Sequence, residues 1–446
     1  MSTAAPGAQW MVFDVDDTLV DTFNVGWRKC QAVARRLSLP APSRTTFAAH
    51  YGRTSFEGCV AAMHPGIDIE RYSSHYDALA VTFPARALGD VAGAVGHIAR
   101  AGFRLGLLTN GPPNKTARKL AAAGLNENDF EFVRHGGSAP WRKPDVRAFR
   151  TLATDYGIDP ELSWYVSDLP ADWAGSAAAG FGSIGIVTGA PHVHGAEDVP
   201  TLVVPRLEAV VGCLPALLAG ARRRACAPVR AVSFDAGFTL IDHVRSPGDL
   251  VAERLRGRTI TTDRTAVAAA LTEYASMLSA DPQVWASAAT TSAMLTAYYG
   301  RVLTRLASPG HAHLASDVVE AYTAPTNWHA RPGAADALMR LRGAGIRTGV
   351  LSNWQPDLPT TLARVGLLDL LDAVVVSSSI GVAKPAPEAF AALAQALGVP
   401  LDGLTHVGDD PVSDAAGALA AGCGAVLVTA APNAPEVVRA LELMTR

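Results

Sequence analysis

The sequence predicts an α/β protein made of two tandem domains, each a doubly wound parallel sheet with an α-helical cap inserted after its first motif. The chain has 446 residues, more than one ordinary hydrophobic core accommodates. Short apolar runs alternate with helical patterns, which is typical of a parallel sheet. A third observation is an internal repeat, because FDVDDTL at 13–19 returns in altered form as FDAGFTL at 234–240.

The first half reads as strands separated by helices. A polar, helix-rich stretch at about 23–88 follows the first motif, and it predicts the cap. A closing helix is expected at 207–219. Buried strands are expected at 10–13, 103–108, 130–133, 163–166 and 183–187.

The second half repeats the later motifs at the same spacing. Asp168 lies 25 residues after Lys143, and Asp409 lies 25 residues after Lys384. Strands are expected at 232–234, 348–351 and 405–407.

The offset between the halves places the difference in the second cap. It is 221 residues between Asp14 and Asp235 but 241 between the two lysines, so about 20 extra residues fall after the second copy's first motif. This copy's cap is expected at about 243–330. The basic triplet at 222–224 reads as a linker, which gives domains at 1–224 and 225–446 with a boundary near Arg224.

Composition excludes several classes of partner. The net charge of −3 gives no electrostatic reason to bind nucleic acid or an anionic membrane. No apolar run approaches the roughly 20 residues that span a bilayer. Residues 1–9 lack the features of a secretory signal, so a cytoplasmic location is expected. The five cysteines form no CxxC pair and are expected to be small buried side chains: Cys30, Cys59, Cys213, Cys226 and Cys423.

The first motif carries the most direct chemical signal. Asp14 and Asp16 lie two residues apart at the carboxyl end of a predicted strand, where open α/β sheets place their chemistry. On a regular strand that spacing puts both side chains on one face. With Asp17 they form three acids in four residues, which repel one another and require a cation or another partner.

The four motifs, taken in order, resemble those of the haloacid dehalogenase (HAD) superfamily of hydrolases. They are DxDxT, a strand ending in Thr-Asn, a Lys-Pro loop, and a strand followed by DxxxD. The resemblance covers nearly the whole chain, twice, and points to the branch with a helical cap. It implies a Rossmann-like fold and a phosphatase that hydrolyses a small phosphorylated metabolite through an aspartyl-phosphate.

The resemblance also implies residue roles in the first half. Asp14 is the nucleophile, and Asp16 is the general acid that protonates the leaving alkoxide and then activates water. The Thr109 hydroxyl binds the transferring phosphoryl group, and Lys143 neutralises charge. A Mg²⁺ site is implied, with hard oxygen ligands, at Asp14, Asp16 (through its backbone carbonyl), Asp168 and Asp172. Asp172 is alternatively the N-cap of the following helix.

The second half departs from the pattern at one position. Asp235 keeps the nucleophile, with Ser352 and Lys384 beside it, but Gly237 stands where the general acid is expected. The implied metal ligands are Asp235, Asp409 and Asp414. This acidic cluster argues against a dehalogenase, which needs no Mg²⁺. Either this half is degenerate, or it acts on a leaving group that needs no proton, such as a phosphoanhydride or acyl phosphate.

Three further hypotheses stay open. The chain is a bifunctional enzyme that removes successive phosphates at two sites, or its second half is a non-catalytic binding or scaffold domain. A phosphomutase also fits, because an aspartyl-phosphate can return its phosphoryl group to a sugar.

The caps are expected to read the substrate. Arg53, in the loop HYGRT at 50–54, binds a second anionic group or is simply exposed to solvent. Asn110 and Asn353 are assigned to substrate contacts. Four aromatic residues of the second cap are expected to form its core rather than a substrate cage: Trp285, Tyr298, Tyr299 and Trp328.

Overall fold

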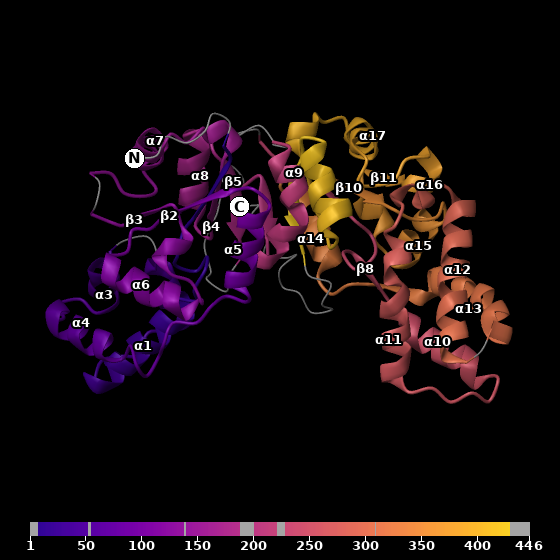
Figure 1. Cartoon of the computed structure of the whole chain (residues 1–446), viewed down its shortest axis with the longest axis horizontal. Coiled ribbons are helices and arrows are strands. Elements are labelled where there is room, and N and C mark those ends of the chain that lie inside the picture. Colours follow the sequence, from indigo (N-terminus) through magenta and orange to yellow (C-terminus); the bar gives the residue numbers. More distant parts are fainter. Residues whose placement is uncertain are drawn as a thin grey trace. The chain divides into compact units, whose positions relative to one another are not determined.

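The computed structural model of the protein describes residues 8–51, 55–137, 140–187, 200–220, 228–307 and 309–428. They form two compact units that divide between Pro228 and Val229 (Figure 1). Each unit has a parallel sheet, flanking helices and a helical cap, which confirms the predicted fold class. The boundary expected near Arg224 lies outside the described residues.

The first unit is built on a parallel sheet in the order β6-β5-β4-β1-β2-β3. Strand β1 lies between β2 and β4, so the chain reverses its direction of winding beside the first motif. The strands are β1 (Trp10–Phe13), β2 (Arg104–Leu108), β3 (Phe132–Arg134), β4 (Trp164–Ser167), β5 (Gly182–Ile186) and β6 (Leu202–Val204).

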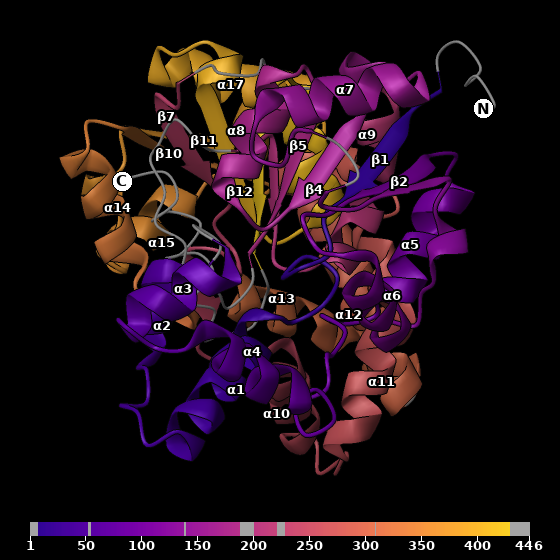
Figure 2. The same ribbon diagram turned by 90° about the vertical axis from the view of Figure 1, so that its left-hand side faces the viewer.

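Helices cover this sheet, which explains why its strands are almost continuously apolar. All four residues of β1 are buried, and α8 packs on β4 and β5 (Figure 2). The helices are α5 (Val91–Arg100), α6 (Pro113–Ala122), α7 (Val146–Tyr156), α8 (Pro170–Ala178) and α9 (Leu214–Leu218). The helix expected at 207–219 begins instead as a 3₁₀ helix, Leu207–Cys213, and becomes α-helical only afterwards.

The first cap occupies the predicted stretch. Three of its helices begin at residues whose side chains accept a hydrogen bond from the first turn: Ser43, Ser55 and Asp68. Its core is made mainly of aromatic and sulfur-containing side chains such as Phe23, Phe47 and Tyr72. The helices are α1 (Phe23–Arg36), α2 (Arg44–His50), α3 (Phe56–Met63) and α4 (Ile69–Ala78).

The second unit repeats this plan with a sheet in the order β11-β10-β7-β12-β13. Its strands are β7 (Ala231–Phe234), β10 (Arg347–Ser352), β11 (Ala373–Val376), β12 (Leu404–Gly408) and β13 (Gly424–Leu427). Its flanking helices are α14 (Ala334–Gly343), α15 (Leu358–Arg364), α16 (Ser377–Ile380), α17 (Pro387–Leu397) and α18 (Gly417–Ala420).

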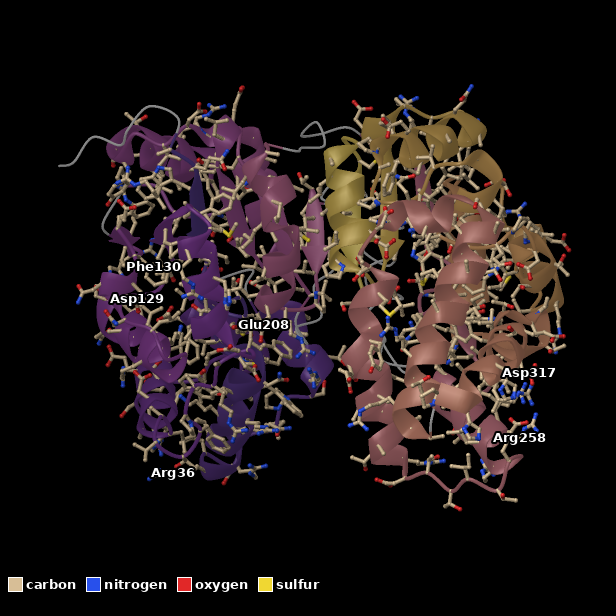
Figure 3. All side chains as sticks on the ribbon, turned by 45° about the vertical axis from the view of Figure 1, so that its right-hand side comes forward. Arg36, Asp129, Phe130, Glu208, Arg258 and Asp317 are labelled. Atoms are coloured by element: carbon tan, nitrogen blue, oxygen red, sulfur yellow. The ribbon has the colours of Figure 1, made fainter. Side chains whose placement is uncertain are left out.

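The second cap joins its sheet through a short antiparallel pair that the sequence did not predict, β8 (Ile241–His243) with β9 (Trp328–Ala330). The cap helices are α10 (Pro247–Arg256), α11 (Arg264–Tyr274), α12 (Ala288–Leu306) and α13 (Ala315–Thr323). Tyr298 and Tyr299 lie in the cap core, as predicted. Each cap carries exposed charged side chains, among them Arg36 on the first and Arg258 and Asp317 on the second (Figure 3).

The turn after the first strand has the same backbone in both units. Asp17 and Phe238 both adopt positive φ, 52° and 57°. The Asp17 amide donates to the Val20 carbonyl, and the Phe238 amide donates to the Ile241 carbonyl. A left-handed conformation is costly for phenylalanine, so the turn geometry is retained in the second unit against a local preference.

Two predictions from composition are tested by the structure. In the part of the chain that the structure describes, no helix is long and apolar enough to cross a membrane. The cysteines within that part are all buried, as expected, and Cys226 lies outside it.

Replacing Leu338 with alanine should lower the free energy of unfolding by about 2–5 kcal/mol, because this residue of α14 has a fully buried side chain. The matched control is Met339→Ala on the same helix, where the side chain is 51% exposed and the loss should stay below about 1 kcal/mol. Urea unfolding of both variants measures this difference, and equal losses would contradict the assignment of the core.

Candidate active sites

The predicted motif residues of the first unit converge at one edge of its sheet. Each follows a strand or lies in the loop after one, and the carboxyl ends of parallel strands share an edge. Side chains of this cluster are buried: Asp14, Thr109, Lys143, Asp168 and Asp172. The predicted assembly of the motifs is therefore present as a single cluster.

Lys143 lies between two carboxylates at the centre of this cluster. Its Nζ is 2.7 Å from Asp14 Oδ1 and 2.8 Å from Asp172 Oδ2. It also donates to the Tyr165 hydroxyl at 2.8 Å. Burial alone would lower the pKa of Lys143, but the charges of Asp14 and Asp172 raise it well above its usual value. The lysine is therefore a permanent cation at the site.

The acids around this lysine remain poorly neutralised. Burial raises the pKa of Asp14 to about 7; Lys143 opposes this, while Asp172 and Asp168 add to it. Burial and the charge of Asp172 raise the pKa of Asp168 to about 8. Buried carboxylates that raise one another's pKa form a donor set of hard oxygens, and this fits a divalent cation such as Mg²⁺.

Asp172 binds protein donors in this structure. Its Oδ2 accepts hydrogen bonds from Lys143, from the Ser167 hydroxyl at 3.3 Å and from the Tyr165 hydroxyl at 3.4 Å. Leu169 is the N-cap of α8, so the alternative role of Asp172 as the N-cap is wrong. Its contacts make it a positioning residue for the lysine.

Asp16 lines the cavity and forms an ion pair with Lys119 of α6. Burial works to raise the pKa of Asp16, but the charge and hydrogen bond of Lys119 outweigh it and leave the pKa below its ordinary value. Asp16 is accordingly ionised while it contacts Lys119.

Asn110 positions the loop that carries the lysine. Its side-chain amide donates to the Lys143 carbonyl at 2.9 Å. The Thr109 hydroxyl accepts from the Gly111 amide at 3.0 Å. Asn110 also lines the cavity, where it can meet a substrate as predicted.

Asp17 is a structural residue that motif reasoning left without a role. Its Oδ1 accepts from the amides of Thr22 and Phe23 at the start of α1, at 3.0 and 2.8 Å. Its Oδ2 accepts from the Tyr51 hydroxyl at 2.7 Å. Asp17 thus ties the cap to the turn after β1. The sequence signal for this role was the third acid of the motif.

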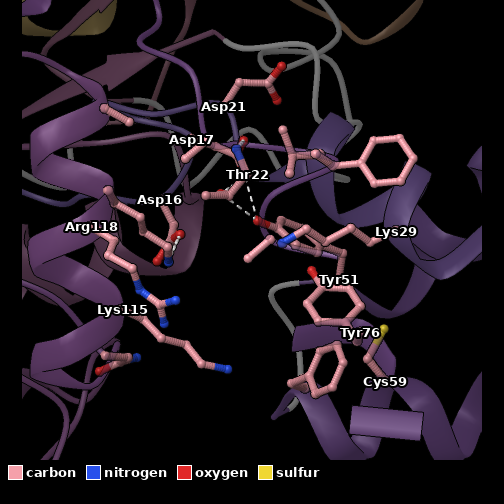
Figure 4. A pocket seen from close by; sticks show the side chains of 18 of the residues that line it. Asp16, Asp17, Asp21, Thr22, Lys29, Tyr51, Cys59, Tyr76, Lys115 and Arg118 are labelled. Atoms are coloured by element: carbon pink, nitrogen blue, oxygen red, sulfur yellow. Dashed lines mark hydrogen bonds and ion pairs between the residues drawn. The ribbon is translucent and has the colours of Figure 1, made fainter. Parts of the chain in front are cut away.

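The first cavity has a volume of about 580 Å³, and basic side chains from α6 and the cap line it; together they are called its basic wall. Lys115 and Arg118 extend from α6 on one side, and Lys29 lies beside Tyr51 and Tyr76 on the cap side (Figure 4). Lys29 lies 5.1 Å from the centre of the Tyr76 ring. Arg53, predicted to bind a second anionic group, lies outside the described residues.

The second unit builds the same lysine-centred cluster. Lys384 Nζ is 2.7 Å from Asp235 Oδ1 and 2.5 Å from Asp414 Oδ1. The Ser352 hydroxyl hydrogen-bonds the Asp235 carboxylate. The Asn353 amide donates to the Lys384 carbonyl at 3.0 Å, as Asn110 does in the first unit.

The predicted metal ligands of the second unit also come together. One carboxylate oxygen from each of Asp235, Asp409 and Asp414 lies within 4.8 Å of the others, so the three fit a hard divalent cation. Burial and the charge of Asp235 raise the pKa of Asp409 to about 8.

His406 takes the place of Tyr165 behind the second lysine. Its Nε2 is 3.2 Å from Asp414 Oδ1, and its Nδ1 is 2.8 Å from the Ser233 hydroxyl. Burial lowers the pKa of His406, so the ring is neutral, donates to Asp414 and accepts from Ser233. Neither Tyr165 nor His406 was recognised from the sequence, because each lies inside an apolar strand.

The second cavity has a volume of about 670 Å³ and an aromatic wall. Trp285 and Trp328 line it with Trp354. Trp285 also packs against the cap core, as predicted, whereas Trp328 lies on β9 outside that core. The reason is the unpredicted pair β8–β9, which carries Trp328 down to the sheet. Gly237 lies at the same cavity, where the first unit has Asp16.

Comparison with known families agrees with this repeated architecture. Residues 11–186 match one haloacid dehalogenase-like hydrolase family model, and residues 229–422 match another. The chain belongs to the haloacid dehalogenase superfamily. It carries two HAD domains in tandem, and both families are described as hydrolases.

Curated relatives match only part of this HAD chain. A phosphoglycolate phosphatase of Cereibacter sphaeroides is 36% identical over 25% of the chain and 49% of its own length. A haloacid dehalogenase-like hydrolase domain-containing protein 3 of Danio rerio is 33% identical over 23% of the chain and 42% of its own length. A phosphoserine phosphatase of Thermus thermophilus is 37% identical over 20% and 36%. The chain thus spans half or less of these relatives.

Two solved structures each align with less than half of the chain. A predicted phosphoglycolate phosphatase from Haemophilus somnus aligns with a TM-score of 0.41 and 18% identity, over 47% of this chain and 98% of its own. CbbY from Rhodobacter sphaeroides, solved with phosphate, aligns with a TM-score of 0.40 and 16% identity, over 46% and 96%.

Replacing Lys143 with methionine should destabilise the first domain by about 3–5 kcal/mol, because it leaves Asp14 and Asp172 buried without their cation. The lysine lowers the pKa of Asp14, which is already about 7, so the variant's Asp14 must bind a proton more tightly still. When folding raises the pKa of an acid, the folded protein becomes less stable as pH rises. The stability lost by the Lys143→Met variant should therefore grow between about pH 5 and about pH 8.

Denaturant unfolding without divalent cations at both pH values tests this. The control is Lys115→Met, which breaks an exposed pair with Asp77 and should cost less than about 1 kcal/mol. A loss that is independent of pH would show that the charge of Lys143 does not control the cluster.

Proposed function

We propose that the first domain is a Mg²⁺-dependent phosphatase that hydrolyses a small phosphate monoester carrying a second anionic group. The observation that carries the proposal is the placement of Asp14, Asp16 and Lys143 on one cavity with a basic wall. The phosphatase names of the partial relatives support this reaction class.

One oxygen of Asp14 is left for nucleophilic attack. Its Oδ1 is 2.7 Å from Lys143 Nζ and accepts from the Val15 amide, also at 2.7 Å. Its Oδ2 has no hydrogen-bond partner in the described residues. Oδ2 therefore attacks phosphorus, the bond to the leaving oxygen breaks, and an aspartyl-phosphate forms. Lys143 holds the carboxylate in place and offsets the charge of the phosphoryl oxygens.

Asp16 serves as the general acid after its pair with Lys119 is exchanged. A phosphorylated substrate brings a competing anion to Lys119, and loss of that contact removes the interaction that lowers the pKa of Asp16. Asp16 then takes up a proton from solvent, gives it to the leaving alkoxide, and takes another from the water that hydrolyses the aspartyl-phosphate.

The Mg²⁺ ion would be held by Asp14, Asp168 and the backbone carbonyl of Asp16. When bound, it supplies positive charge opposite the phosphoryl oxygens. Thr18 supports this set, because its hydroxyl accepts from the Asp168 amide at 3.2 Å and lies 3.4 Å from Asp168 Oδ1. These contacts hold Asp168 in the loop after β4.

The basic wall selects the rest of the substrate. Lys29, Lys115 and Arg118 line the side of the cavity formed by α6 and the cap, and Asp77 is the acid paired with Lys115. A second carboxylate or phosphate on the substrate would meet these cations. Phosphoglycolate and phosphoserine, the substrates named for two relatives, both have a carboxylate beside the phosphate.

Replacing Asp14 with asparagine should abolish phosphate release from phosphoglycolate and phosphoserine by the first domain. Replacing Asp16 with asparagine should reduce kcat by roughly 10²–10⁴-fold, because the leaving alkoxide then departs without a proton. Asp68→Asn is the control, since asparagine caps α4 as well as aspartate does. Phosphate release is measured with and without Mg²⁺, and an active Asp14→Asn chain would refute the proposal.

Replacing Arg118 with glutamine should lower kcat/KM for phosphoglycolate by roughly 10–100-fold, through the loss of one charged hydrogen bond. Ethyl phosphate, which lacks a second anionic group, should be affected less than about threefold. Arg100→Gln at the end of α5 is the matched control. Equal losses on both substrates would show that Arg118 does not read the second anion.

A further inference from the structure

The two domains differ by a reciprocal exchange of side chains beside the nucleophile. Two residues after the nucleophile, the first domain has Asp16 and the second has Gly237. After the Thr-Asn and Ser-Asn pairs, the first has Gly111 and the second has Trp354. A Cβ atom on Gly237 would lie 3.2 Å from Cζ3 of Trp354, so the indole occupies the space beside the missing acid.

Trp354 is held rigidly at this place. Its backbone is fixed by two hydrogen bonds. The Trp354 amide donates to the Ser377 hydroxyl at 3.2 Å, and the Trp354 carbonyl accepts from the Ser378 hydroxyl at 2.7 Å. Its ring centre is 4.6 Å from that of Trp328, with the planes inclined at 66°. The Trp328 indole N–H is itself fixed on the Tyr322 carbonyl at 3.2 Å. These rings form a preorganised aromatic wall.

The charge of the second cavity is confined to its catalytic end. Among the described residues that line it, Lys384 is the single basic side chain, whereas the first cavity has several. Away from Lys384 and its acids the lining is mainly apolar and aromatic: Ala275, Leu278, Pro282, Trp285, Leu295, Tyr322 and Trp328. A fitting ligand carries one phosphoryl group and an uncharged, flat body.

The cavity also lacks a proton donor in the place of Asp16. Three of its carboxylates, Asp235, Asp409 and Asp414, form the acidic cluster. The fourth, Asp410, accepts hydrogen bonds from the amides of Val412 and Ser413 in the turn that follows it. An alkoxide leaves poorly without a proton, but a phenol's oxygen leaves as an aryl oxide. The aromatic wall and the missing acid therefore select the same chemical class.

We propose that the second domain binds and cleaves aryl phosphates, with the aromatic ring against Trp354 and Trp328 and the phosphoryl group at Lys384 and Asp235. This rests on the aspartyl-phosphate chemistry proposed for the first domain. A carboxylate oxygen of Asp235 forms a bond to phosphorus, and the bond from phosphorus to the aryl oxygen breaks. The aryl oxide leaves with the electron pair and takes a proton from water.

The second step is slow in this domain. Water must attack the aspartyl-phosphate and lose its proton to solvent, because no residue in the place of Asp16 accepts it. The phosphoryl group consequently stays on Asp235 long enough to accumulate.

The test uses the full chain with Asp14→Asn, which silences the first nucleophile, in Mg²⁺. Phenyl phosphate should be cleaved on the order of a hundredfold faster than glycerol phosphate. Intact mass should increase by one phosphoryl group, and both effects should vanish when Asp235→Asn is added. Trp354→Leu should raise KM for phenyl phosphate roughly threefold to tenfold while kcat holds. The control is Trp141→Leu, an exposed tryptophan of the first domain.

Calorimetric titration with phenylphosphonate provides a readout that is independent of turnover. It should bind the Asp14→Asn chain more tightly than inorganic phosphate does, and Trp354→Leu should remove that advantage. The double change Gly237→Asp with Trp354→Gly should give the second domain the ability to cleave glycerol phosphate.

Equal rates on the two esters, or binding of phenylphosphonate without release of phenol from phenyl phosphate, would overturn the proposal. Failure of the first domain's proposed function is a separate result. It would appear as a wild-type chain whose turnover of phosphoglycolate does not depend on Asp14.

Discussion

Each domain depends on a buried lysine ammonium held between two carboxylates at the edge of its sheet. Lys143 and Lys384 lie within 3 Å of acids from two different strand ends, so the ion pairs fix the relative positions of the loops. Without the lysine, the acids would be buried like charges, which are costly. The same asparagine contact occurs in both domains: the side-chain amides of Asn110 and Asn353 donate to the backbone carbonyls of Lys143 and Lys384 and so help to place the lysines.

Around this shared centre, the two domains differ in the residue two positions after the first motif's leading aspartate and in the walls of their cavities. The first keeps Asp16 and a cavity with several cations, whereas the second has Gly237 and a wall of tryptophans. The residue behind the lysine also differs. Tyr165 hydrogen-bonds Lys143 in the first domain, whereas the second has a neutral His406 that is hydrogen-bonded to the Ser233 hydroxyl. The fold therefore fixes where the shared cluster lies, and the cap and the residues beside Asp14 and Asp235 shape the two cavities differently.

The sequence predicted the strands that carry the motifs because strands buried on both faces are continuously apolar. It missed β8 and β9, which are only three residues long and partly polar, so no period can reveal them. It brought the motif acids and lysines together correctly, since strand ends share an edge. It did not foresee that Lys119 binds Asp16 or that Tyr51 binds Asp17, because these partners come from distant helices whose packing only the folded chain defines.

The third acid of each cluster shows how a motif can conceal a role. Asp172 and Asp414, which were predicted as metal ligands, also accept hydrogen bonds from protein donors. Asp172 Oδ2 accepts from Lys143, and Asp414 uses Oδ1 for Lys384 and Oδ2 for the Asp410 amide. The charge of Lys384 and the hydrogen bond from His406 hold the pKa of Asp414 far below its usual range, although burial opposes this. Each of these acids contacts its lysine, and the lysine in turn contacts Asp14 or Asp235.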